Sequence, residues 1–206
     1  PAGRGPGVTP AGRRSCAPQT TDPKQRTNIQ LQINKLNQQA AKYAIPNEFS
    51  KLLTRYGTTA INAYTTLDET VYHSECAPQY IAQWCQLNSE RFINPVFRLF
   101  QGELETVYEE KNRGEDNFGV QLMEHLQGQV FKGSGYEFPV IGSTENLKNP
   151  RLSDMEAFYQ KYYVANNMAL ILCGKFNEKD VLPLLEKTFG RIHNGPIPQR
   201  QPINLA

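Results

Sequence analysis

The chain has 206 residues, of which 39% are hydrophobic, so it can form one ordinary domain, or a large piece of a bigger one, with an apolar core. It holds no run of about eighteen apolar residues, so we expect no membrane span. The net charge is +2, but three of the 22 basic residues fall within positions 1–19, which contain no acid, leaving 19 basic against 20 acidic residues in the rest. A nucleic-acid partner is therefore not expected.

Residues 1–19 are rich in Gly, Pro, Ala and Arg and carry almost no large apolar side chains. Such a stretch cannot offset the entropy lost on ordering, so we predict a disordered tail. We interpret it as sequence that is not native to the protein, from a frameshift, a fusion or a wrongly assigned start. A native basic tail that binds nucleic acid is the weaker alternative, because it would have only three charges.

The first helix is predicted to begin after Asp22, which suits an N-cap and is followed by Pro23 at the first helical position and Gln25 as the partner in a capping box. Apolar residues then recur at steps of three and four as far as Tyr43, which is typical of an amphipathic helix. Pro46 ends this helix.

The remaining elements follow from periodicity and from the Gly and Pro residues between them. We predict helices at about 47–56, 81–92, 95–112, 118–131, 153–162 and 178–189, a hairpin of strands 59–65 and 69–75, and a buried apolar strand at 168–174. The helix at 153–162 is expected to start at a capping box of Ser153 and Glu156. Because strands and helices do not alternate regularly, the predicted fold class is α+β, with an antiparallel sheet flanked by helices. We assign residues 20–195 to one partial domain and 196–206 to the start of a linker.

The helix at 95–112 carries the most informative side chains. Glu103 and Glu110 are seven residues apart, so they project from the same side, beside the apolar stripe that should face the core. A carboxylate in a core must be paired, protonated or bound to a cation, and zinc is one suitable partner. Alternatively, a slight rotation of the helix leaves both acids in water or in salt bridges, as on many acid-rich helices.

Other chemical motifs are weak. The three histidines are isolated from one another, and no phosphate-binding loop or esterase nucleophile motif occurs. The four cysteines show no Cys-x-x-Cys spacing, so we expect free thiols.

Several short motifs, in this order and spacing, resemble the pitrilysin/insulinase/mitochondrial-processing-peptidase family of zinc metallopeptidases. They are residues 62–72 (NAYTTLDETVY), 89–95 (SERFINP), 100–110 (FQGELETVYEE), 141–147 (IGSTENL) and 163–176 (YVANNMALILCGKF). Residues 43–49 and 108–112 further resemble bacterial members with a long inserted helix.

The resemblance implies roles for four residues. Glu110 corresponds to the zinc-binding glutamate, Glu103 to a glutamate that supports the metal site, and Asn62 with Ala63 to the edge-strand pair that binds an extended substrate. The family's His-x-x-Glu-His motif, which supplies two zinc ligands and the general base, lies upstream of the hairpin and is absent here. The expected fold is thus an N-terminally truncated catalytic domain with no catalytic residue present.

Two functions follow from the resemblance. The first is a fragment of a zinc metalloendopeptidase that cleaves extended peptides, inactive alone, with zinc bound in the complete protein but not by this chain. The alternative is a non-catalytic family subunit that acts as a binding or assembly module. Expected partners are a peptide substrate and a second pitrilysin-type domain or subunit. The compartment stays open, with an exported, periplasmic bacterial protein favoured over a cytoplasmic one.

Overall fold

The computed structural model describes residues 22–97, 99–147 and 151–199, so the tail predicted for 1–19 and most of the predicted linker lie outside the described residues. The predicted α+β class is confirmed: helices accompany a two-stranded antiparallel sheet. The helices and strands are α1 (Pro23–Ala41), α2 (Glu48–Arg55), β1 (Thr59–Thr65), β2 (Thr70–Glu75), η1 (Pro78–Tyr80), α3 (Ile81–Ile93), α4 (Phe100–Glu115), α5 (Phe118–Val130), η2 (Gly135–Glu137), α6 (Thr144–Leu147), α7 (Leu152–Tyr162), η3 (Ala165–Asn167), α8 (Glu178–Thr188) and η4 (Phe189–Arg191).

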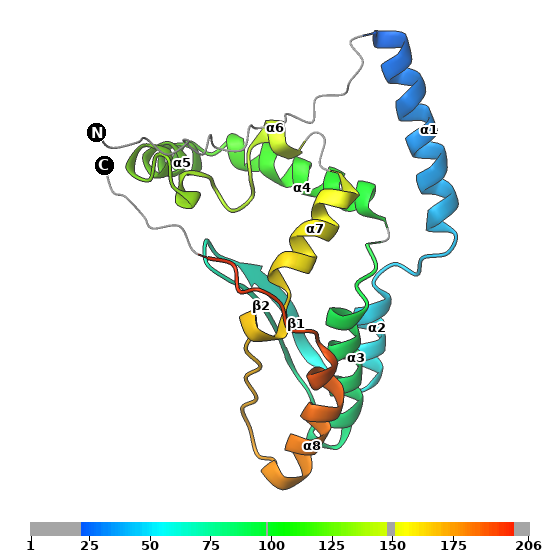
Figure 1. Cartoon of the computed structure of the whole chain (residues 1–206). Helices are drawn as coiled ribbons and strands as arrows, with labels where there is room; N and C mark the ends of the chain where they lie inside the picture. Colours follow the sequence, from blue (N-terminus) through cyan, green and yellow to red (C-terminus); the bar gives the residue numbers. More distant parts are fainter. Residues whose placement is uncertain (1–21, 98, 148–150, 200–206) are drawn as a thin grey trace, which may run out of the picture.

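The elements form two groups (Figure 1). In one group, α3 packs against α2 and α8 near the β1–β2 hairpin. In the other, α4 packs against α5 and α6. Helix α7 lies between the two groups, and α1 projects to one side.

Helix α1 begins as the sequence predicts. Asp22 is the N-cap, its carboxylate accepts a hydrogen bond from the Lys24 backbone N–H at 3.0 Å, and Pro23 opens the helix. The apolar stripe of α1 is nevertheless exposed, with Ile29 48% and Leu36 63% accessible. The amphipathic pattern therefore predicts the helix correctly. In the described part of the chain, however, no other element covers the apolar face of this helix.

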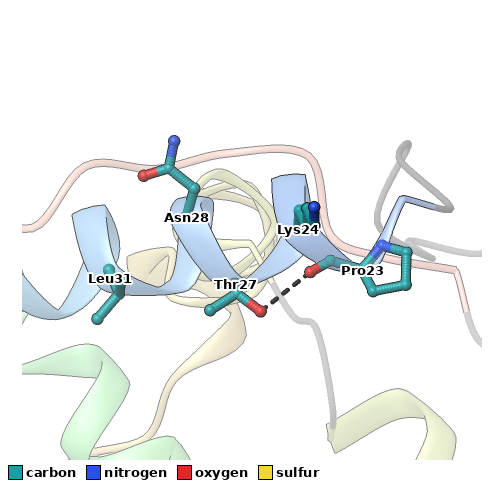
Figure 2. A pocket seen from close by; sticks show the side chains of 5 residues that line it. All are labelled: Pro23, Lys24, Thr27, Asn28 and Leu31. Carbon is teal, nitrogen blue, oxygen red and sulfur yellow. Dashed lines mark hydrogen bonds between the residues drawn. The ribbon is translucent and has the colours of Figure 1, made fainter.

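A shallow hollow lies on the first turns of α1 (Figure 2). All of its lining residues come from this one helix, and Thr27 bonds back to the Pro23 carbonyl at 2.9 Å. No second described element contributes a polar or charged group to the lining, so the hollow lacks the converging polar groups that are typical of a ligand-binding site.

The hairpin has the predicted strands and a short turn. The Thr66 N–H donates to the Glu69 carbonyl at 2.8 Å, and the Thr66 hydroxyl accepts from the Asp68 and Glu69 N–H groups. In β1 the register shifts between Thr59 and Asn62, and Ala60 adopts a positive φ of 49°. This is a β-bulge, which bends the strand just before Asn62.

The apolar core is small for a chain of this composition. Many large apolar side chains on α1 and α5 and in the segment after η3 are exposed. Those that are buried come mainly from α2, α3 and α8 and from the two loop segments that flank α8. They are Leu53, Cys85, Val164, Val181 and Ile192.

Two helix boundaries differ from the prediction. The helix predicted at 95–112 begins at Phe100 and runs to Glu115, because Leu99 has a left-handed φ of 61° that helical backbone cannot adopt. The helix predicted to start at Ser153 begins at Leu152 with Arg151 as N-cap, so the capping box is wrong. An ion pair of 3.1 Å between Arg151 and Asp154 spans that first turn instead.

The buried strand predicted at 168–174 is wrong. Met168 has extended backbone angles, and residues 168–174 belong to no helix or strand in the part of the chain that the structure describes. Ile171 is 85% and Leu170 43% exposed. The apolar run identifies an extended segment, but burial needs a neighbouring strand, which the described residues do not supply.

An ion pair joins α4 to α5. The Lys111 Nζ atom lies 2.7 Å and 2.9 Å from the two carboxylate oxygens of Glu124, and the Lys111 side chain is only 6% exposed. A buried ammonium needs such a partner, because an unpaired buried charge costs several kcal/mol.

We expect Glu124→Ala to lower the free energy of unfolding by about 2 kcal/mol, less than a fully buried pair would cost because Glu124 is 27% exposed. Replacing both partners, by Lys111→Met with Glu124→Leu, should restore most of the loss. Urea unfolding measures this, with Glu105→Ala on the exposed side of α4 as control. A double variant as unstable as Glu124→Ala would contradict a pairwise origin.

Candidate functional site

The candidate binding edge lies on β1. Asn62 is opposite His73 and Ala63 opposite Tyr72 on β2, and both Asn62 and Ala63 are exposed. Among the described residues β1 pairs with β2 alone, so its other edge has unpaired backbone groups. Such an edge can accept an extended polypeptide as an additional strand.

The Asn62 side chain caps part of this edge. Its oxygen accepts a hydrogen bond from the Ala63 backbone N–H at 2.8 Å. The amide nitrogen of Asn62 has no partner within the described residues, and the side chain is exposed. Asn62 therefore offers donors beside the strand edge, and an incoming peptide carbonyl would compete with its oxygen for the Ala63 N–H.

A cluster of aromatic rings around Arg91 fixes the hairpin on α3. The Arg91 guanidinium lies 4.2 Å from the centre of the Tyr72 ring and 4.8 Å from that of Phe49. At these distances the cation is attracted to the ring faces. On the same side, the Trp84 indole N–H donates to the Ser74 hydroxyl at 2.9 Å. We call the residues Tyr72, Arg91, Phe92, Tyr159 and Tyr163 the aromatic cluster.

Helix α7 completes the aromatic cluster. The Tyr72 and Tyr163 hydroxyls are 2.9 Å apart, and the Tyr163 ring stacks on Tyr159 with centroids 4.3 Å apart. The Tyr159 hydroxyl donates to the Phe92 carbonyl at 2.9 Å. The cluster thus joins β2, α3 and α7, which are far apart in sequence.

Burial in the aromatic cluster suppresses ionisation of its phenols. Burial, followed by the hydrogen bond to Tyr163, raises the pKa of Tyr72 well above its usual range. Burial also raises the pKa of Tyr159 to about 12, with a further contribution from Tyr163. Both phenols are therefore neutral at physiological pH and serve as hydrogen-bonding and packing groups.

The structure does not bring the two acids into a site with the hairpin. Glu103 and Glu110 are both exposed on α4, and the residue of α4 that is buried is Lys111. The expectation that both acids face the core is wrong, because both side chains are exposed to solvent. Within the described residues, no hydrogen bond or ion pair joins either acid to Asn62 or Ala63.

These acids do not form a zinc site by themselves. Among residues 22–97, 99–147 and 151–199, no three His, Cys, Asp or Glu side chains are grouped closely enough to hold a metal ion. A structural or catalytic zinc takes three or four protein ligands. The roles of Glu110 as a metal ligand and of Glu103 as its support therefore stay predictions.

Burial raises the pKa of two of the thiols, Cys76 and Cys85. Cys76, Cys85 and Cys173 are free, as the spacing predicts, while Cys16 lies outside the described residues. Burial raises the pKa of the Cys85 thiol to about 11, with a smaller contribution from Cys76. Cys85 is therefore protonated at neutral pH and is not a nucleophile.

Arg91, Tyr159 and Tyr163 belong to the aromatic cluster, although the sequence predicts no role for them. Arg91 and Tyr163 lie in the motifs of residues 89–95 and 163–176, but these motifs support only the family resemblance and predict no contact between the two side chains. A usable signal was present: Tyr159 and Tyr163 are four residues apart at the end of a helix, where their rings can stack.

Comparison with known sequences finds similar proteins. A family model described as "Peptidase M16 inactive domain" matches residues 151–206. Mitochondrial-processing peptidase subunit beta of Caenorhabditis elegans is 23% identical over 137 residues, covering 66% of this chain and 30% of that protein. Mitochondrial ubiquinol-cytochrome-c reductase complex core protein I of Euglena gracilis is 26% identical over 138 residues, covering 66% and 28%. The chain thus spans about 30% of the length of these relatives.

Solved structures show the same fold. A protease from Helicobacter pylori superposes with a TM-score of 0.66 at 24% identity, covering 77% of this chain and 39% of that one. Pitrilysin superposes with a TM-score of 0.61 at 18% identity, covering 78% and 18%. At these identities the likeness shows a shared α+β fold. These comparisons support the resemblance to the pitrilysin, or M16, family that the sequence motifs indicate.

The names of the sequence relatives bear on the compartment of the protein. The preference for an exported bacterial protein is wrong, because the curated sequence relatives are mitochondrial proteins of eukaryotes by their names. Within the described residues, no helix combines the length and the hydrophobicity needed to cross a bilayer.

We expect the aromatic cluster to make stability fall at alkaline pH. The folded-state pKa values of Tyr72 and Tyr159 lie above the value of about 10 for an unfolded chain. Their contribution is therefore complete below pH of about 10 and is lost as the pH rises further. Tyr72→Phe should cost about 1 kcal/mol at pH 7, from the lost hydrogen bond, and make the alkaline fall shallower. Urea unfolding between pH 7 and 11.5 tests this.

Tyr64→Phe is the matched control, because this tyrosine is 50% exposed and phenylalanine keeps its ring contact with His73. It should leave both the neutral-pH stability and the alkaline profile unchanged. If the free energy of unfolding falls equally steeply at alkaline pH in Tyr72→Phe and in the unsubstituted chain, ionisation of Tyr72 is not the cause of the fall.

We expect Glu110→Gln to change the free energy of unfolding by less than about 0.5 kcal/mol, because Glu110 is exposed and unpaired among the described residues. Zinc at micromolar concentration should raise the melting temperature by less than about 1 °C, since stabilisation requires a dissociation constant near or below the zinc concentration. Differential scanning fluorimetry measures the shift. A rise of several degrees that Glu110→Gln abolishes would show that Glu110 does bind zinc in this chain.

Proposed function

We propose that this chain is a non-catalytic module of an M16-family protein that binds extended polypeptide along the free edge of β1. The observation that carries the proposal is the exposed, one-sided pairing of β1, with Asn62 and Ala63 on its surface. In strand addition, the backbone supplies most of the hydrogen bonds, so the module would accept many sequences.

The rigid support of this edge favours binding. Tyr72 lies opposite Ala63, and Arg91 and Tyr163 hold Tyr72 from two sides. A strand that is already fixed loses little conformational entropy when a peptide pairs with it. The bulge at Ala60 and the turn at Thr66 limit the regular edge to about five residues.

The comparisons support a non-catalytic role. The matching family model is described as an inactive domain, and one relative is named as a core protein of a respiratory complex. The described residues contain no ligand set for zinc. M16 relatives also occur in assemblies, such as the respiratory complex III of Candida albicans. We therefore propose a second M16-type domain or subunit as the assembly partner.

A second candidate function is part of a zinc metalloendopeptidase. It is favoured by the names of several relatives, which are mitochondrial-processing peptidase beta subunits, and by the two acids on one side of α4. Here zinc would have to be held largely by residues beyond those the structure describes, with Glu110 contributing one ligand. The chain alone would then bind polypeptide without cleaving it.

Fluorescein-labelled β-casein, an unfolded polypeptide, tests the proposal. We expect it to bind with a rise in fluorescence anisotropy, and we expect Asn62→Ala to weaken binding about fivefold, the effect of losing one hydrogen bond of about 1 kcal/mol. Asn28→Ala on the exposed face of α1 is the matched control and should bind normally.

Gel electrophoresis of the same mixtures, with and without zinc, separates the two candidate functions. Intact casein after prolonged incubation supports the non-catalytic module. Zinc-dependent cleavage would favour the peptidase, and equal binding by the Asn62→Ala and Asn28→Ala variants would remove the β1 edge from the proposal.

A further inference from the structure

The sequence contains a single Asn-Gly pair, Asn194–Gly195, in the segment that follows η4. Such a pair is prone to spontaneous deamidation. Glycine has no side chain to shield its backbone nitrogen from the neighbouring asparagine amide, and it lets the backbone bend toward that amide. Asn194 is exposed, so water and base reach its side chain. Among the asparagines of the chain, Asn194 is therefore the one whose local sequence most favours this reaction.

Packing requires the glycine of this pair. A Cβ atom added to Gly195 would lie 2.7 Å from the Cγ1 atom of Val164, which is closer than real Cβ contacts. Val164 is only 1% exposed, so the atoms around it limit its movement. A larger residue at position 195 would therefore disturb a buried side chain, and the fold retains a chemically reactive pair at this place.

The side chain of Asn166, in η3, holds Gly195 through both ends of its amide. Its oxygen accepts a hydrogen bond from the Gly195 N–H at 3.0 Å, and its nitrogen donates to the Gly195 carbonyl at 2.7 Å. A third hydrogen bond runs from the Ala165 N–H to the His193 carbonyl at 2.9 Å. These contacts form where the segment after η4, drawn in red, passes the end of α7 (Figure 1). We call the three hydrogen bonds the Asn166 clamp.

Deamidation uses the nitrogen that the Asn166 clamp holds. The Gly195 nitrogen attacks the side-chain carbonyl carbon of Asn194, and the new bond closes a succinimide ring. The amide nitrogen of Asn194 leaves as ammonia and takes the proton that the Gly195 nitrogen loses. Water then opens the ring at one of its two carbonyls, giving aspartate or isoaspartate. Because the hydrogen bond to Asn166 must break before the nitrogen can lose its proton and turn, the folded chain should react slowly.

We propose that Asn194 is a deamidation site that the Asn166 clamp protects in the folded chain, and that the isoaspartyl product opens the clamp. In isoaspartate the backbone runs through the Cβ and Cγ atoms of residue 194, so an additional methylene separates His193 from Gly195. The clamp joins these two residues to neighbouring positions of η3, and the longer backbone no longer fits both. The segment after η4 is then released from η3. This inference does not depend on the proposed polypeptide binding at β1.

Ageing of the full 206-residue chain at mildly alkaline pH tests the protection. Mass spectrometry of the tryptic peptide of residues 192–200 measures how much of the Asn194 amide has become acid. We expect Asn166→Ala to deamidate at least about fivefold faster than the unsubstituted chain, the factor to which one hydrogen bond corresponds. The unsubstituted chain unfolded in urea gives the rate without any clamp and should also exceed the folded rate by at least about fivefold.

Asn167→Ala is the matched control. The Asn167 side chain also donates one hydrogen bond to a backbone carbonyl, but that carbonyl belongs to Tyr162, at 2.9 Å. This variant should deamidate at the unsubstituted rate, and equal acceleration in both variants would show that general loosening controls the reaction. Circular dichroism checks that both variants are folded. If Asn166→Ala does not fold, the comparison with urea still decides, because equal rates in the folded and unfolded chain would contradict protection.

Hydrogen exchange tests the opening of the clamp. Aged chain that carries isoaspartate, identified by labelling with an isoaspartyl methyltransferase, should lose protection at the amides of Ala165 and Gly195. Asn194→Asp adds the same charge but keeps the normal backbone, so it should retain that protection. Protection kept in the isoaspartyl chain would overturn the inference, and so would an equal loss in Asn194→Asp, because charge would then be the cause.

Discussion

The position of Tyr72 is the constraint on which the candidate site depends. Its ring is held by Arg91 from α3, and its hydroxyl by Tyr163 after α7, while its backbone pairs with β1 opposite Ala63. A two-stranded hairpin is marginal in water without such packing. The aromatic cluster therefore stabilises the hairpin and also sets where the free edge of β1 lies.

This arrangement explains why the family motifs are distributed along the chain. The hairpin motif supplies Tyr72, the motif of residues 89–95 supplies Arg91, and the motif of residues 163–176 begins with Tyr163. They are separate in sequence but form one set of contacts in the structure. Their spacing is constrained because each element must deliver one side chain to the same place.

Local features were the easiest to predict. The N-cap at Asp22 and the hairpin turn between residues 65 and 69 follow from interactions among near neighbours, and the structure contains both. The predicted start of α4 is wrong because Leu99 adopts a left-handed conformation that no local sequence pattern requires. Likewise, a seven-residue spacing puts Glu103 and Glu110 on one side of a helix, but only the packing partners decide whether that side faces a core.

The failure at residues 168–174 has the same origin. An apolar run of this length predicts an interior strand, but the prediction assumes that neighbouring strands exist, and the described residues provide only the β1–β2 hairpin. Many apolar side chains of α1 and α5 are exposed for a comparable reason, because the described elements do not cover them. The sequence pattern therefore predicts that more apolar side chains are buried than the described residues bury among themselves.

The β1 edge and the segment 168–173 differ in how well they tolerate water. The β1 edge is built from residues such as Thr59, Asn62 and Thr65, which tolerate water when no peptide is bound. The segment 168–173 consists of apolar residues and gains free energy only while it is covered. A polar edge favours reversible binding, which is the kind of binding proposed for β1.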